Sequence, residues 1–139
     1  MPEFVTLKIE ITETTINVSI IDSNKKETII QLRPNQTQYP LNIWFNKNEI
    51  VVCQEQPNEQ TISGFVKEIF HDPTEYKTYE IEYQGNKHNV LGETLLALII
   101  QQFKEIIDKT YIINNLVITI PKETNKEVIH RIKSSLVNI

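Results

Sequence analysis

Hydrophobic and polar residues alternate along the opening part of the chain. Apolar side chains occupy every second position over residues 5–11 and again over 16–20, which is the two-residue period of a half-buried β-strand. Residues 27–32 suggest a third strand. The polar residues 13–14 and the turn-forming residues 22–26 separate the three segments, and such residues favour tight connections. The pattern therefore predicts an antiparallel meander of three strands.

Two further strand pairs are predicted in the middle of the chain. Residues 42–45 and 50–53 flank one polar turn, and residues 79–83 and 88–90 flank another. Short apolar or alternating runs on either side of a polar turn are typical of β-hairpins. We therefore expect two hairpins between the opening meander and the carboxyl-terminal third.

Three segments carry apolar residues at the spacing that defines an amphipathic helix. A short helix is predicted after Thr61, which can act as its N-cap, and a long helix is predicted over residues 91–111. A closing helix is predicted from the capping-box sequence of residues 124–127. The apolar positions of the three helices are Phe65, Ile69 and Phe70; Leu95, Leu96, Ile99, Phe103, Ile106 and Ile107; and Val128, Ile129, Ile132 and Leu136.

Residues 116–120 form a short β-branched run that Pro121 ends. A continuous apolar run of this length is typical of a strand that is buried on both faces inside a sheet. We therefore expect an internal strand between the long helix and the closing helix.

Composition restricts the class of protein. The 139-residue chain is 40% hydrophobic and 23% charged, which is typical of one globular domain with an ordinary core. Its longest apolar run, residues 95–100, is far shorter than the roughly twenty residues that cross a bilayer, so no membrane partner is expected. The amino terminus lacks the features of a secretion signal, and Cys53 is the single cysteine. A cytoplasmic location is predicted.

Charge and glycine content exclude two common functions. The net charge is −4 and the Lys and Arg residues are scattered, so no basic stripe is present to follow a nucleic-acid backbone. The three glycines, Gly64, Gly85 and Gly92, are too far apart to form a dinucleotide-binding or P-loop motif. Nucleic acid is therefore not an expected partner, and a Walker-type ATPase is not expected.

Several segments nevertheless match, in order, the motifs of one ATPase family. Residues 9–18 read I-E-I-T-E-T-T-I-N-V, in register with I-D-L-G-T-T-x-S-x-V, and residues 37–45 are similar to R-T-T-P-S-V-V-A-F. Residues 66–73 are similar to A-K-R-L-I followed by D-D-P. Residues 95–111 stand where the family has a long helix, and residues 116–121 match A-V-I-T-V-P. These are motifs of the seventy-kilodalton heat-shock (DnaK-type) chaperones, in the N-terminal part of their nucleotide-binding domain.

The resemblance implies an α/β chain with the actin-like ATPase (ribonuclease H-like) fold. Residues 1–139 would form a single partial lobe I, divergent from the family. Residues 1–35 and 113–139 would supply its core sheet and closing helix, and residues 36–112 an inserted small subdomain and the long helix. Because family members continue further, we expect either a piece of a larger chain or a naturally short relative.

The resemblance also implies a nucleotide site at the first hairpin turn. In the family this turn brings backbone N–H groups and hydroxyls to the phosphates of ATP, which is bound with Mg²⁺. The implied ATP-contacting residues are Glu10, Thr12, Glu13, Thr14 and Thr15. Glu10 would reach the Mg²⁺ through water.

Two residues of this turn differ from the family pattern. Thr12 replaces a glycine whose missing Cβ allows close approach to phosphate. Glu13 replaces a hydroxyl residue, and like charges ~4 Å apart repel by about 4 kcal/mol at an effective dielectric constant near 20. Two interpretations stay open: a nucleotide-binding loop and an ordinary polar hairpin turn.

Lys67 stands where the family has a lysine that orients the attacking water and stabilises the transferred phosphoryl group. The resemblance therefore implies a catalytic role for Lys67. The alternative interpretation, a solvated lysine on the surface of a helix, is equally compatible with the sequence. Since the family's other metal-binding carboxylates fall beyond the matching segments, autonomous ATP hydrolysis is not expected.

Two functional hypotheses follow. The first is a fragment of a chaperone ATPase domain, with ATP binding and ATP-dependent protein folding as its inherited role and with unfolded clients or co-chaperones as partners. The second is a non-enzymatic protein-interaction module on the same scaffold, in which Thr12 and Glu13 have erased the phosphate site. With the later strands of the family absent from the matching segments, the strand that ends at Ile120 is expected to expose an edge for self-association or for pairing with another chain.

Overall fold

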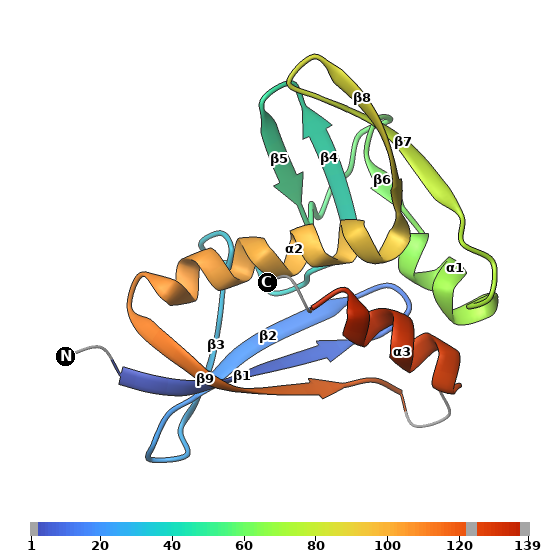
Figure 1. Cartoon of the computed structure of the whole chain (residues 1–139). Helices are drawn as coiled ribbons and strands as arrows, with labels where there is room; N and C mark the ends of the chain where they lie inside the picture. The colour runs from blue at the N-terminus through green and yellow to red at the C-terminus, as the bar shows by residue number, and fades with distance from the viewer. Residues whose placement is uncertain (1–2, 122–124, 137–139) are drawn as a thin grey trace.

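A four-stranded sheet forms the base of the molecule (Figure 1). The computed structural model of the chain describes residues 3–121 and 125–136. The sheet has the order β3-β2-β1-β9, in which β1 (Glu3–Ile11), β2 (Ile16–Ile21) and β3 (Glu27–Ile29) are antiparallel and β9 (Tyr111–Thr119) runs parallel to β1. The predicted meander is therefore confirmed.

The strand β1 shows why the opening residues form a sheet with one buried face. Val5, Leu7, Ile9 and Ile11 are buried, whereas the intervening side chains are partly exposed. Because successive side chains of a strand point to opposite faces, the alternation turns every second residue toward the helices. The hydrophobic core therefore lies between this face of the sheet and the helix layer.

The helix α2 (Gly92–Asp108) leads into β9 and lies across the buried face of the sheet (Figure 1). Its fully buried side chains are Leu95, Leu96, Ile99, Ile100, Phe103 and Ile107. They confirm the predicted apolar face and add Ile100, while Ile106 is only partly buried. No described helix is both long and apolar enough to cross a membrane.

The predicted end of this helix is wrong. The backbone N–H of Thr110 donates to the carbonyl of Ile107 in a closing turn, and Tyr111 is already the first residue of β9. The helical spacing of Tyr111 in the sequence is coincidental, because its backbone hydrogen bonds go to β1.

Both predicted hairpins are confirmed, and they rise from the side of α2 that faces away from the base sheet (Figure 1). The first consists of β4 (Asn42–Asn46) and β5 (Glu49–Val52), and β6 (Ile62–Ser63) extends it to three strands. The second consists of β7 (Thr78–Tyr83) and β8 (Asn86–Leu91). An edge-to-face contact between Phe45 and Tyr83 joins the two hairpins.

The start of each of the two shorter helices differs from its prediction. The helix α1 (Phe65–His71) has Gly64 as its N-cap, in the left-handed region at φ 78°. Thr61 instead donates its hydroxyl to the Gln54 side chain. The helix α3 (Lys126–Ser134) is capped by Asn125, whose side chain accepts from the N–H of Glu127. The predicted capping residue Thr124 lies outside the described residues.

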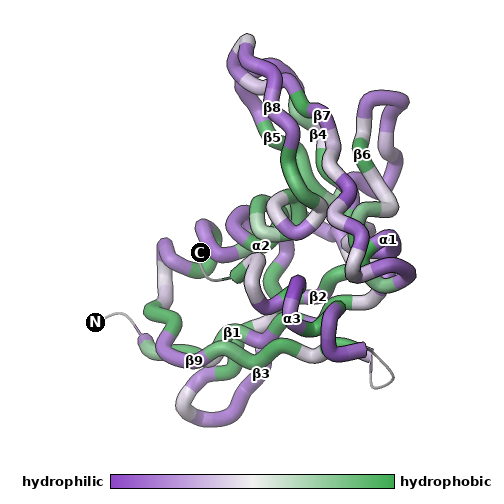
Figure 2. The backbone as a smooth tube through the Cα atoms, turned by 45° about the vertical axis from the view of Figure 1, so that its right-hand side comes forward, coloured by the Kyte–Doolittle hydropathy of each residue, from purple (hydrophilic) through white to green (hydrophobic). Residues whose placement is uncertain are grey.

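The prediction of an internal strand at 116–120 is also wrong. Among the described residues, β9 pairs with β1 on one side only and is an edge strand. Leu116 is 47% exposed and Val117 46%. Figures 1 and 2 show the reason: both α2 and α3 lie on one face of the base sheet, and the hydrophobic β9 follows its rim.

Candidate functional site

The turn between β1 and β2 is closed by its own threonine hydroxyls. The Thr12 Oγ1 accepts hydrogen bonds from the backbone N–H groups of Thr14, at 3.3 Å, and Thr15, at 3.0 Å. It also lies 2.7 Å from the Thr15 Oγ1, and the Thr12 N–H donates to the Thr15 carbonyl. Side-chain acceptors of this kind satisfy a turn locally. The N–H groups of Thr14 and Thr15 therefore already have an acceptor.

A groove of about 500 Å³ adjoins this turn. Its walls come from three places that are far apart in sequence, the β1–β2 turn, the end of α1 and the start of α3. The lining residues are Thr12, Glu13, Thr14, Phe70, Pro121, Asn125 and Val128. Three consecutive residues among the predicted phosphate contacts thus line one groove, and the tertiary structure brings α1 and α3 to them.

The charge beside this groove is acidic. The carboxylate of Glu13 lies 3.5 Å from Nε2 of His71 at the end of α1, and the two side chains are 43% and 61% exposed. Glu13 therefore links the hairpin turn to α1. A phosphate brought to the turn would meet this carboxylate, and close like charges repel.

Three other predicted residues, Glu10, Thr15 and Lys67, do not line the groove. Glu10 lies on β1, where its carboxylate is 3.1 Å from the ammonium of Lys8. Lys8 also contacts Glu27 at 3.0 Å, and the hydrogen bonds that it donates to the Glu27 and Glu10 carboxylates raise the pKa of Lys8. Lys67 is an exposed residue of α1. Within the described ranges, no cluster of three His, Cys, Asp or Glu side chains could hold a metal ion.

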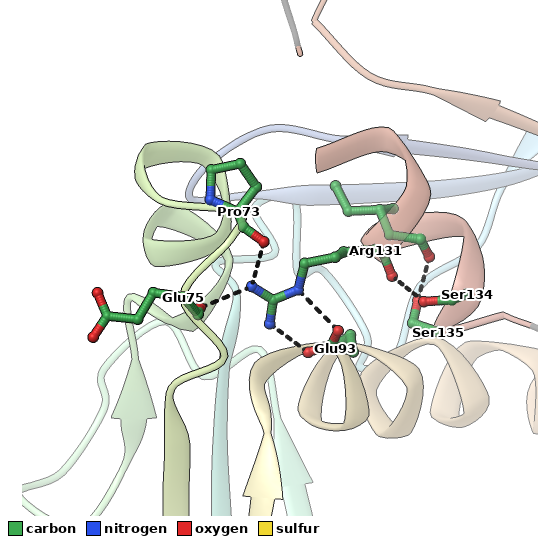
Figure 3. Close-up of polar contacts among 7 residues, drawn as sticks. Pro73, Glu75, Glu93, Arg131, Ser134 and Ser135 are labelled. Carbon is green, nitrogen blue, oxygen red and sulfur yellow. Dashed lines mark hydrogen bonds and ion pairs between the residues drawn. The ribbon is translucent and has the colours of Figure 1, made fainter. Parts of the chain in front are cut away.

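A second polar cluster joins α3 to α2 and to the loop that follows α1 (Figure 3). The guanidinium of Arg131 donates from Nε and Nη2 to the two carboxylate oxygens of Glu93, at 2.9 and 2.6 Å. Its Nη1 donates to the carbonyls of Pro73 and Glu75. The guanidinium carbon also lies 4.4 Å from the ring centre of Tyr76.

This cluster is buried and internally satisfied. The side chain of Arg131 is 3% exposed and that of Glu93 12%. The adjoining cavity, beside Phe65 and Gly92, measures about 10 Å³, which is room for about one water molecule. The cluster therefore has a structural role, since it leaves no space for a substrate.

Sequence reasoning missed Arg131, although its position carried a signal. It lies between Val128 and Ile132, on the buried stripe of α3. A charged residue within an apolar helix stripe needs a buried partner, because an unpaired buried charge is unfavourable. The sequence pattern indicates that Arg131 needs a buried partner. That partner, Glu93, is far away in sequence, and only the fold identifies it.

The Glu93 carboxyl makes stability depend on pH. Burial is the largest single influence and acts to raise its pKa, but the hydrogen bond from Arg131, the hydrogen bond from the backbone of Glu93 itself and the positive charge of Arg131 together outweigh burial, and the net pKa falls below the ordinary 4.5. The stabilisation is therefore complete above the ordinary pKa and is lost as the pH falls through the lowered one. We expect the difference in urea midpoint between wild type and Glu93→Gln to be large at neutral pH and to shrink in acid. A difference in urea midpoint that grew in acid would contradict the lowered pKa of Glu93.

No protein-family model and no curated protein matches this chain.

Proposed function

We propose that this chain is a non-enzymatic protein-interaction module on an actin-like ATPase (ribonuclease H-like) scaffold. The observation that carries the proposal is the closure of the first hairpin turn by Thr12. A phosphate-binding turn presents unpaired backbone N–H groups to the ligand, and here the hydroxyl of Thr12 accepts from those of Thr14 and Thr15.

The arrangement of the base sheet supports this scaffold. The proposed fold requires the opening strands and the strand after the long helix to share one sheet. The strands β1 and β9 are parallel neighbours over most of their length, with Ile9 beside Ile118 and Leu7 beside Leu116. The helix α2 leads into β9 across the buried face, as a parallel connection needs a crossover.

The acidic groove supports the loss of the phosphate site. Glu13 lines it, and the net charge of the chain is −4. Lys67 does not line it. Among the described residues that line the groove there is no cation, so the described lining lacks the positive charge that phosphoryl transfer requires.

ATP binding with Mg²⁺, as an inherited chaperone function, is the second candidate. One observation favours it: Thr12, Glu13 and Thr14 line a groove that opens beside the amino end of α3. In this function Thr15 would contact phosphate, Glu10 would hold Mg²⁺ through water, and Lys67 would need to move toward the groove. Unfolded proteins or co-chaperones would be its partners.

Isothermal titration of the chain with Mg-ATP separates the two candidates. We expect no binding heat, because the N–H groups of Thr14 and Thr15 already donate to Thr12 and Glu13 repels phosphate. Saturable binding in the micromolar range would overturn the interaction-module proposal and favour the nucleotide function.

The double variant Thr12→Gly, Glu13→Thr is expected to bind Mg-ATP at least tenfold more tightly than wild type, a gain of about 1.4 kcal/mol. Glycine removes the hydroxyl that accepts from the turn N–H groups, and threonine removes the repelling carboxylate. Titration calorimetry measures the change.

The matched control for this variant is Glu80→Thr, which removes an exposed carboxylate from β7. It tests whether a general change of net charge is sufficient. An equal affinity for the double variant and wild type would show that Thr12 and Glu13 do not block the turn.

A further inference from the structure

The free edge of β9 is long, apolar and uncharged. Its nine residues contain no Lys, Arg, Asp, Glu or Pro. Natural sheets protect a long edge with charges, prolines or bulges; β9 has neither of the first two and carries one irregularity, at Asn114. In the part of the chain that the structure describes, no strand pairs with the outer side of β9. Ile112, Leu116 and Val117 are 40%, 47% and 46% exposed.

The sequence of β9 is close to a palindrome in residue type. Two asparagines, Asn114 and Asn115, separate the apolar triplets 111–113 and 116–118. An antiparallel copy centred between the asparagines would place each triplet opposite the other. The paired residues would be Tyr111 with Ile118, Ile112 with Val117, and Ile113 with Leu116.

An irregularity in β9 puts these paired residues on matching faces. Val5 and Thr6 of β1 are consecutive, but their partners are Ile113 and Asn115, so Asn114 is an extra residue. Residues five apart on a regular strand point to opposite faces. Asn114 shifts the alternation by one residue. Ile112 and Val117 therefore both project from the face of the base sheet that points away from the helices.

The register with β1 supports this assignment of faces. Ile112 lies beside Phe4 and Val117 beside Lys8, neither of which is buried. Ile113 and Leu116 lie beside Val5 and Leu7, which are buried against the helix layer. Each apolar side chain of β9 would thus meet an apolar partner on its own face.

We propose that β9 pairs with β9 of a second copy of this chain, antiparallel and about a two-fold axis between Asn114 and Asn115. The proposal rests on the interaction-module function and names its partner. Asn side chains both donate and accept hydrogen bonds, so they are self-complementary at the axis. The two base sheets join into one continuous sheet, and the isologous contact closes after two copies.

The opposite edge of the sheet is a poorer partner. The strand β3 has only three residues. It also carries Glu27, which is paired with Lys8. Pairing of β9 with β3 of another copy would be short, and it would build an open chain of molecules instead of a closed dimer.

Mixed cysteine variants test the register. We expect Ile112→Cys mixed with Val117→Cys to form a disulfide-linked dimer under mild oxidation, because directly opposed residues lie within disulfide reach. Either variant alone should not cross-link, since its two cysteines are about 16 Å apart along the strand. Cys53 is fully buried, and burial raises the pKa of its thiol to about 12, so it does not compete.

Sedimentation velocity tests whether the native chain pairs. We expect a dimer fraction that rises with concentration, and at least tenfold weaker dimerisation in Val117→Lys, which places a charge opposite Ile112. The matched control is Ile29→Lys, because Ile29 is 70% exposed on the other edge strand. It should leave the dimer unchanged.

Three results would overturn the proposal. They are a wild-type monomer at all concentrations, a dimer that Ile29→Lys weakens as much as Val117→Lys does, and equal cross-linking of Ile112→Cys with Ile29→Cys. None of them bears on Mg-ATP binding. Titration with Mg-ATP tests the interaction-module function separately, so failure of one proposal is distinguishable from failure of the other.

Discussion

Replacing Arg131 by alanine is expected to lower the free energy of unfolding by about 3–5 kcal/mol. This is the typical cost of removing one partner of a buried ion pair and leaving the other charge unpaired. The substitution leaves the carboxylate of Glu93 without its bidentate partner. It also removes the donor to the carbonyls of Pro73 and Glu75. Urea denaturation followed by circular dichroism measures the change.

A surface ion pair provides the matched control. Lys104 and Asp108 lie one turn apart on α2, with their charged groups 2.7 Å apart and their side chains 31% and 46% exposed. Lys104→Ala is expected to change the stability by about 0.5 kcal/mol or less. If Arg131→Ala were equally mild, the guanidinium cluster would not hold α3 to α2.

A double substitution separates burial of charge from loss of packing. Replacing both partners, Arg131→Met with Glu93→Leu, removes the unpaired charge while it keeps most of the volume. Buried ion pairs can be replaced by apolar side chains at little cost, so the double variant should recover much of the stability that Arg131→Ala loses. No recovery would indicate that the carbonyls of Pro73 and Glu75 dominate the effect.

Replacing Phe103 by alanine is expected to cost about 3–5 kcal/mol, typical of a large aromatic side chain removed from a core. Phe103 is fully buried on α2. Its ring meets that of Tyr39 edge to face, with centroids 5.4 Å apart. Tyr39 in turn donates its hydroxyl to the carbonyl of Gln36. The cavity would therefore loosen the segment between β3 and β4 as well as the helix.

The control for Phe103→Ala is Ile29→Ala, at a side chain that is 70% exposed. Exposed positions away from special features usually change stability by about 0.5 kcal/mol or less. Thermal denaturation of both variants measures the contrast. Similar losses at the two positions would contradict the assignment of the core to the layer between α2 and the base sheet.

The candidate site was only partly predictable from sequence. The first hairpin turn follows from the alternation on both sides of it, and the predicted polar turn is where the chain reverses. The hydrogen bonds from the Thr14 and Thr15 N–H groups to the Thr12 hydroxyl depend on the turn's backbone conformation. Residue identity alone does not specify that conformation, so the sequence left both interpretations of the turn open.

The lining of the groove depends on distant contacts. Phe70 and Asn125 meet the turn because α1 and α3 pack beside each other and against α2. Lys67 is three residues before Phe70, yet it lies on the exposed side of α1. A sequence match places a lysine on a helix, but the packing of that helix decides which of its sides reaches the groove.

The sequence by itself determined the strands, the hairpins and the long helix of this protein, because periodicity and turn residues act over a few neighbouring positions. Only the tertiary structure decided that β9 is an exposed edge and that Arg131 pairs with Glu93. The sequence of an apolar strand is the same whether the strand is internal or at the edge of a sheet. Burial and pairing depend on which distant segments arrive beside a residue, and packing of the whole chain sets that arrangement.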